Sequence, residues 1–187
     1  MEMNKFILGL SSALAILTLG SIFCIRNIVW GSVPLQVGLM LFIREGYSLL
    51  IIPLSSALGA PSLGGGVSPG IWPLLIWIFT AFFIGFMIHE PGTSARIILT
   101  SAMIVFASWI FSVFISYPLL LDNLTWMSFI DKVMSDLLFY RLLDIIFLMV
   151  IPPIASSIFS LLPLVFSKLA SRSKKEKEQL YEEDLFI

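Results

Sequence analysis

Long uncharged runs dominate the pattern of hydrophobic and polar positions along this chain. Between Gly46 and Ile88 no side chain carries a formal charge, and three further uncharged runs, residues 6–25, 97–121 and 145–167, are each 20 residues or longer. A transmembrane helix needs about 20 apolar residues, and a charged side chain at the bilayer centre costs about 2.5 to 3.5 kcal/mol. The pattern therefore predicts an all-α integral membrane protein, with spans near residues 6–25, 70–88, 97–117 and 142–166.

Residues 28–60 are apolar enough to enter the membrane, but Pro34, Pro53 and the charged neighbours Arg44 and Glu45 interrupt them. Three placements stay open: a position along the outer membrane surface, a re-entrant dip, and two short crossings. Each placement keeps the number of crossings even, so both termini lie on one side. We expect a polytopic bundle of about four transmembrane helices plus a membrane-associated or re-entrant segment at residues 28–60.

Basic residues predict the direction in which the chain crosses the membrane. With both termini in the cytoplasm, seven Lys and Arg side chains lie inside and four lie outside, as the positive-inside rule favours. Trp72, Trp126 and Tyr140 then fall near the outer interface, where amphipathic aromatic rings prefer to lie. We predict a multi-pass protein of the cell membrane with a cytoplasmic N-terminus and a cytoplasmic C-terminus.

The chain divides into a transmembrane helical bundle, residues 1–167, and a charged cytoplasmic tail, residues 168–187. A basic cluster at the start of the tail is of the kind that anionic lipid attracts. It consists of Lys168, Arg172, Lys174, Lys175 and Lys177.

Composition supports the membrane assignment and narrows the possible chemistry. Apolar residues make up 58% of the chain and charged residues only 12%, against about 25% charged in soluble domains. Cys24 is the only cysteine, which excludes an internal disulfide, a cysteine-based zinc site and an iron–sulfur cluster held by this chain alone. We expect no cofactor and no nucleic-acid partner.

Three pairs of ionisable residues are the candidates for function. His89 and Glu90 end the second predicted span, either as a polar helix end or as a proton relay, because a histidine titrates near neutral pH. Arg141 and Asp144 are three residues apart and share a helical face. They and the pair Arg44 and Glu45 are either anchors at the interface or, if they are buried, functional groups that need a partner.

A stripe of small residues on the third predicted span suits close helix packing. It consists of Thr100, Ser108, Ser112 and Ser116. Gly9 with Ala13 and Ser156 with Ser160 repeat this spacing in the first and last spans. Such stripes serve packing within the bundle, a polar pore face or contact with a partner subunit.

Residues 128–140 predict an amphipathic helix suited to the outer interface. Its expected apolar face comprises Phe129, Ile130, Val133, Met134, Leu137 and Leu138. Its expected polar face comprises Asp131, Lys132, Ser135 and Asp136.

These features favour a non-enzymatic integral membrane protein, a small subunit or scaffold that packs against other membrane subunits or against its own copies. The alternative is a transport component for a small solute, an ion or a lipid, in which residues 28–60 line a cavity. A membrane enzyme that uses His89 is the third hypothesis.

Overall fold

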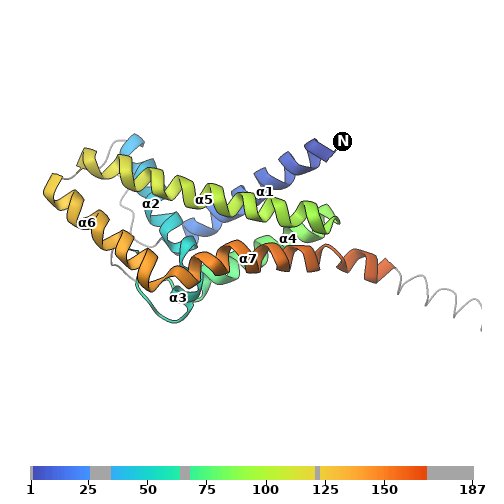
Figure 1. The fold of residues 1–187 in the computed structure, drawn as a ribbon. Helices are drawn as coiled ribbons and strands as arrows, with labels where there is room; N and C mark the ends of the chain where they lie inside the picture. Colours follow the sequence, from blue (N-terminus) through green and yellow to red (C-terminus); the bar gives the residue numbers. More distant parts are fainter. Residues whose placement is uncertain (1, 26–34, 64–67, 121–122, 168–187) are drawn as a thin grey trace, which may run out of the picture.

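The computed structural model of the chain describes residues 2–25, 35–63, 68–120 and 123–167. Every secondary-structure element in these residues is a helix, so the prediction of an all-helical chain is confirmed. Figure 1 shows their arrangement. In chain order the helices are α1 (Glu2–Cys24), α2 (Leu35–Ile51), α3 (Pro53–Ala57), α4 (Trp72–Ile88), α5 (Pro91–Leu120), α6 (Asn123–Ser135), the π-helical turn η2 (Asp136–Tyr140) and α7 (Leu142–Phe159).

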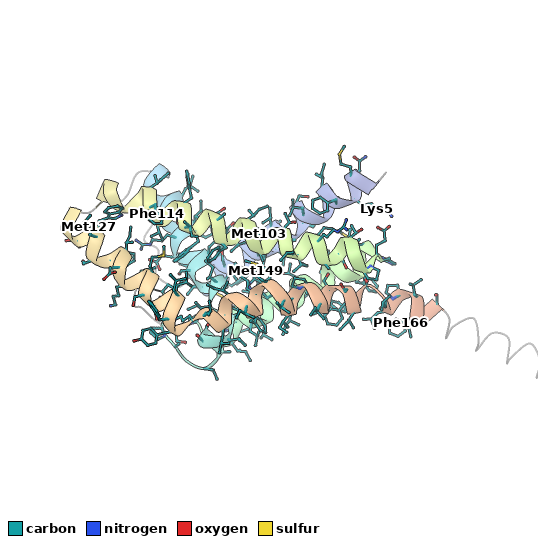
Figure 2. All side chains as sticks on the ribbon, viewed as in Figure 1. Lys5, Met103, Phe114, Met127, Met149 and Phe166 are labelled. Atoms are coloured by element: carbon teal, nitrogen blue, oxygen red, sulfur yellow. The ribbon has the colours of Figure 1, made fainter. Side chains whose placement is uncertain are left out.

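Four of these helices, α1, α4, α5 and α7, pack along the long axis of the molecule (Figure 1). The start of α1, the end of α4, the start of α5 and the end of α7 meet at one end, where Lys5 Nζ lies 2.7 Å from Glu90 Oε1. We call this the Lys5 end. The opposite end contains α6 and the start of α2, and we call it the α6 end. Figure 2 shows Lys5 and Phe166 towards the first end and Met127 and Phe114 towards the second.

Three helices are long and apolar enough to cross a membrane. The candidate spans are Met3–Cys24, Pro91–Ile115 and Leu142–Ser167. α4 is also apolar but has only 17 residues. α5 begins at Pro91, six residues before the predicted span, because a proline fits the first turn of a helix, where its missing N–H group is not needed.

The described part of the ambiguous segment, residues 35–60, packs into the bundle. α2 lies against α1 and α5, and the hydroxyl groups of Tyr47 and Thr18 are 3.1 Å apart. The last turn of α2 and the residue after it, Leu49 to Ile52, are buried. Residues 28–34 lie outside the described part of the chain.

Small residues allow the helices of the bundle to approach one another closely. A Cβ atom on Gly85 of α4 would collide with the Ser156 carbonyl oxygen of α7 and lie 3.0 Å from the Ser160 backbone nitrogen. Ser156 and Ser160 are fully buried there. Gly9 similarly faces Ile88 and Ile97. The small residues predicted to pack in the first and last spans thus lie at contacts between helices of the bundle.

α6 turns an apolar face towards the bundle and a polar face outward. Val133 is buried, whereas Ser128, Asp131 and Lys132 are exposed, as the amphipathic pattern predicts. Leu138 departs from the prediction because it lies in η2 and is exposed.

We predict that Gly85→Ala destabilises the protein. The added methyl group meets backbone atoms, which cannot move aside as a side-chain end can, and overpacking of this kind costs about 1 to 3 kcal/mol. The measurement is the unfolding free energy in detergent. Gly92→Ala is the control, since no atom lies within 4 Å of a Cβ there. Equal stability of the two variants would contradict the close approach of α4 and α7.

Candidate functional site

The candidate site forms around a break in the chain between α2 and α3. Pro53 occupies the first turn of α3, and Ile52 before it provides no side-chain cap. A helix start leaves several backbone N–H groups without partners in the helix, and these groups are costly when they are buried. The surroundings of Ile51 and Ile52 are apolar, so the partners must come from other elements.

Asp144 of α7 supplies the missing cap. Its Oδ1 atom accepts hydrogen bonds from the backbone nitrogens of Leu54, at 2.7 Å, and Ser55, at 3.0 Å. The Ser55 hydroxyl donates to Oδ2 of the same carboxyl group. Asp144 is only 1% exposed. An acidic side chain at a helix N-terminus satisfies the free donors and interacts favourably with the helix dipole.

Trp77 of α4 provides a hydrogen-bond donor for the end of α2, on the other side of the break. Its indole Nε1 donates to the carbonyl oxygen of Leu50, at 2.8 Å, near the end of α2. Both groups are buried, and the Trp77 side chain is fully inside the core. The carbonyl would otherwise be an unpaired acceptor at the end of a helix.

Arg141 fixes the chain beyond α3. Its Nη1 donates to the carbonyl oxygen of Pro61, at 2.7 Å, and its Nε donates to Asp136 Oδ1, at 3.1 Å. The residue is 7% exposed. Arg141 and Asp144 therefore hold one short segment at two points, Pro61 and the start of α3. We call Trp77, Asp136, Arg141 and Asp144 the helix-break cluster.

The π-helical turn η2 brings Asp136 into this cluster. A π-turn adds a residue to the helical repeat, which changes the face that later residues occupy. Asp136, expected on the outer polar face, is half-buried and bonds to Arg141. Leu137, Arg141, Asp144 and Leu148 follow one another on the inner side.

A second set of hydrogen bonds fastens the loop after α3. The Ser56 hydroxyl donates to the carbonyl oxygen of Gly70, at 2.6 Å. The Gly70 nitrogen donates to Ser68 Oγ, at 3.2 Å. Gly70 has a φ of 67°, a conformation that glycine adopts without strain. The loop thereby returns to the start of α4.

Arg44 and Glu45 form an ion pair on α2, separate from the helix-break cluster. The Glu45 side chain is 41% exposed. Gly46, the next residue, faces Ser21 and Ile25 at the end of α1. The pair is therefore level with the last turn of α1.

His89 and Glu90 lie at the Lys5 end, far along the bundle from α3. His89 ends α4 with a left-handed φ of 60°, is exposed, and its ring lies 5.9 Å from that of Phe86. Glu90 accepts hydrogen bonds from Lys5 and Thr93. The Lys5 hydrogen bond, with a further contribution from Thr93, holds the pKa of Glu90 below its ordinary value. This arrangement ties α1 to the start of α5.

The predicted packing stripe on α5 is only partly inside the bundle. Thr100 and Ser108 are half-buried, and Ser112 is buried and donates to the Trp109 carbonyl, at 2.8 Å. The side chain of Ser116 and the basic residues of the tail lie outside the described part of the structure.

The helix-break cluster binds backbone groups of residues 50–61 through hydrogen bonds. Asp144 already accepts three hydrogen bonds. Among the described residues no group of three or more His, Cys, Asp and Glu side chains could hold a metal ion. Arg141 and Asp144 are candidates from the sequence alone, whereas Trp77, Ser55 and Asp136 join the cluster only in the structure. The uncapped start at Ile52 and Pro53 was the signal that a distant cap was needed.

We predict that Asp144→Ala lowers the unfolding free energy by about 2 to 4 kcal/mol, because two buried N–H groups lose their acceptor. Asp144→Asn keeps one acceptor oxygen and is expected to lose less than half as much. Thermal or denaturant unfolding in detergent measures both. Asp131→Ala, on the exposed face of α6, is the matched control and is expected to change stability by less than about 0.5 kcal/mol. An Asp144→Ala variant as stable as the control would refute the capping role.

Comparison with protein-family models, curated proteins and solved structures finds no match to this chain. We therefore infer its function from the geometry of its own residues.

Proposed function

We propose that this chain is a multi-pass protein of the cell membrane that acts as a non-enzymatic subunit or scaffold of a membrane complex. The main support for the proposal is that the buried ionisable side chains bind the backbone of the protein itself. Arg141 and Asp144 bind the backbone of residues 54–61, so both are committed to holding the fold. Three apolar helices of sufficient length support the membrane location.

Large exposed apolar surfaces support a role in helix association. α4 exposes Phe79, Phe82, Phe83 and Phe86, and α7 exposes Ile146, Ile154 and Ile158. Such surfaces are unusual on a soluble monomer and suit lipid tails or the helices of other subunits.

The transport hypothesis would need polar groups of residues 28–60 to meet a solute. In the described part of this segment, the backbone of Leu54 and Ser55 is bound by Asp144, and the Leu50 carbonyl is bound by Trp77. These groups would have to lose their partners to bind a solute, at about 1 to 3 kcal/mol for each unsatisfied group. These backbone groups thus support the scaffold hypothesis, and the partly exposed Glu45 is the group at which the transport hypothesis is tested.

Both termini are proposed to be cytoplasmic. The support is the excess of basic residues on that side of the predicted topology. The start of α1 and the end of α7 also lie at the same end of the bundle (Figure 1). The Lys5 end then faces the cytoplasm and the α6 end faces outward.

Cysteine labelling tests this orientation in a Cys24→Ala background. Gly92→Cys lies at the Lys5 end and Ser128→Cys on the exposed face of α6. An impermeant thiol reagent added to intact cells is expected to modify Ser128→Cys at once and Gly92→Cys only after the cells are opened. The reverse order of labelling would invert the proposed topology.

Isolation of the full chain in a mild detergent, followed by native mass measurement, tests the scaffold role. We expect a reproducible complex with a fixed number of other membrane subunits or copies of the chain. Glu45→Gln is expected to leave the complex intact and to change stability by at most about 1 kcal/mol, since partly exposed ion pairs contribute little.

Reconstitution of the purified chain in vesicles tests the transport hypothesis directly. Solute flux through the chain alone, lost in Glu45→Gln although the variant folds normally, would reject the scaffold hypothesis in favour of transport. A chain that stays monomeric in detergent and in vesicles would also reject it.

A further inference from the structure

The exposed surface changes character along the continuous run of α6, η2 and α7. α6 exposes the polar side chains of Thr125, Ser128, Asp131 and Lys132, with Met127 among them. In η2 the exposed residues become apolar or aromatic, with Phe139 82% and Tyr140 80% exposed. α7 continues this surface with Leu142 and Leu143. The change falls within about two helical turns, between Lys132 and Leu138.

Contacts between the helices show which residues lie at the same height as this change. Gly85 of α4 faces Ser156 and Ser160 of α7. Because the two helices run parallel, Trp72 at the start of α4 comes level with the first turn of α7. Gly20 of α1 faces Ile76. Since α1 runs antiparallel to α4, Phe23 lies beside the first turn of α4.

Exposed apolar and aromatic side chains from different helices therefore share one level. Phe23 of α1 is 86% exposed, and Leu58, just after α3, is 88% exposed. Trp72 of α4 and Phe139 and Tyr140 of η2 complete the set. We call Phe23, Leu58, Trp72, Phe139 and Tyr140 the aromatic level.

The distance from this level to the Lys5 end matches a bilayer. α4 runs from Trp72 to Ile88, and 17 residues of α-helix span about 25 Å, close to the hydrocarbon thickness of about 30 Å. Over this height the exposed side chains of α4 are apolar. They are Leu75, Ile78, Phe79, Phe82, Phe83 and Phe86.

We propose that the headgroup boundary of a phospholipid bilayer lies at the aromatic level. α6 then lies in water beyond the bilayer and not in the interface that its amphipathic pattern predicts. The break between α2 and α3 lies just inside the bilayer as a re-entrant element. The occupant is lipid because the level crosses α1, α4 and η2 and because the exposed side chains of α4 are apolar over about the height of a bilayer. Tryptophan and tyrosine are also enriched at such boundaries. This inference rests on the membrane location in the proposed function but not on the scaffold role.

Two features of the charged residues agree with this boundary. Arg44 and Glu45 lie level with the end of α1, where headgroup water hydrates the half-exposed carboxylate. Asp144 follows Tyr140 by one helical turn and is only 1% exposed, so its backbone partners have no water to replace it. On α5 the apolar surface continues to Phe111 and Phe114, so the boundary is inclined towards that helix.

Spin labels at single cysteines in the full-length Cys24→Ala chain test the depth. The chain is reconstituted in vesicles of phosphatidylcholine and phosphatidylglycerol, and the collision of each label with oxygen and with a water-soluble nickel chelate is measured. Suitable positions are exposed in the structure: Leu58 at the boundary, Phe83 in the lipid region, and Ser128 and Gly92 in water.

We expect the label at Phe83 to collide mainly with oxygen and the labels at Ser128 and Gly92 to collide mainly with the nickel chelate. The ratio of nickel to oxygen collisions is expected to be at least tenfold higher at Ser128 and Gly92 than at Phe83, with an intermediate ratio at Leu58. Oxygen dominance at Ser128, or nickel access at Leu58 equal to that at Ser128, would overturn the proposed boundary while leaving the membrane location intact. Nickel access at Phe83 equal to that at Gly92 would overturn the membrane location itself. Exclusion of both probes at Phe83 would show protein, and not lipid, on α4 and would also overturn the boundary.

Discussion

The fold depends on the need to satisfy backbone groups where the chain breaks between α2 and α3 inside apolar surroundings. Neither helix can provide these partners, because the break removes the regular hydrogen bonds and Pro53 has no N–H group. Asp144 and Trp77 provide them from 90 and 27 residues away. The position of α2 and α3 is consequently tied to α4 and α7, and each of these elements constrains the others.

The same two helices that satisfy the break also approach each other closely at their backbones. Gly85 of α4 lies against Ser156 and Ser160 of α7, towards the opposite end of the contact from Trp77 and Asp144. Small residues fix the pair at the Lys5 end, and hydrogen bonds through α3 fix it at the other. This combination explains how α4, although only 17 residues long, keeps a defined position.

Several polar residues in the described part of the chain hold its own segments in place. Arg141 joins η2 to the loop after α3, Lys5 joins α1 to Glu90, and Ser56 joins α3 to Gly70. The external faces of α4 and α7 are left apolar. A structure of this kind is suited to present fixed helix surfaces to lipid and to other membrane proteins, as the proposed function requires.

Local sequence determined the helical composition, the three long apolar helices and the inward face of α6 at Val133. Each of these depends on residues within a few turns of one another, so hydrophobic run length and helical period are sufficient to predict them. The sequence also identified Arg141 and Asp144 as residues that would need partners if they were buried. Only the tertiary structure decided that those partners are the backbone of residues 54–61, that Asp136 turns inward and that Trp77 caps α2. Such pairings join segments tens of residues apart and depend on the register of a π-turn, and neither leaves a periodic pattern in the chain.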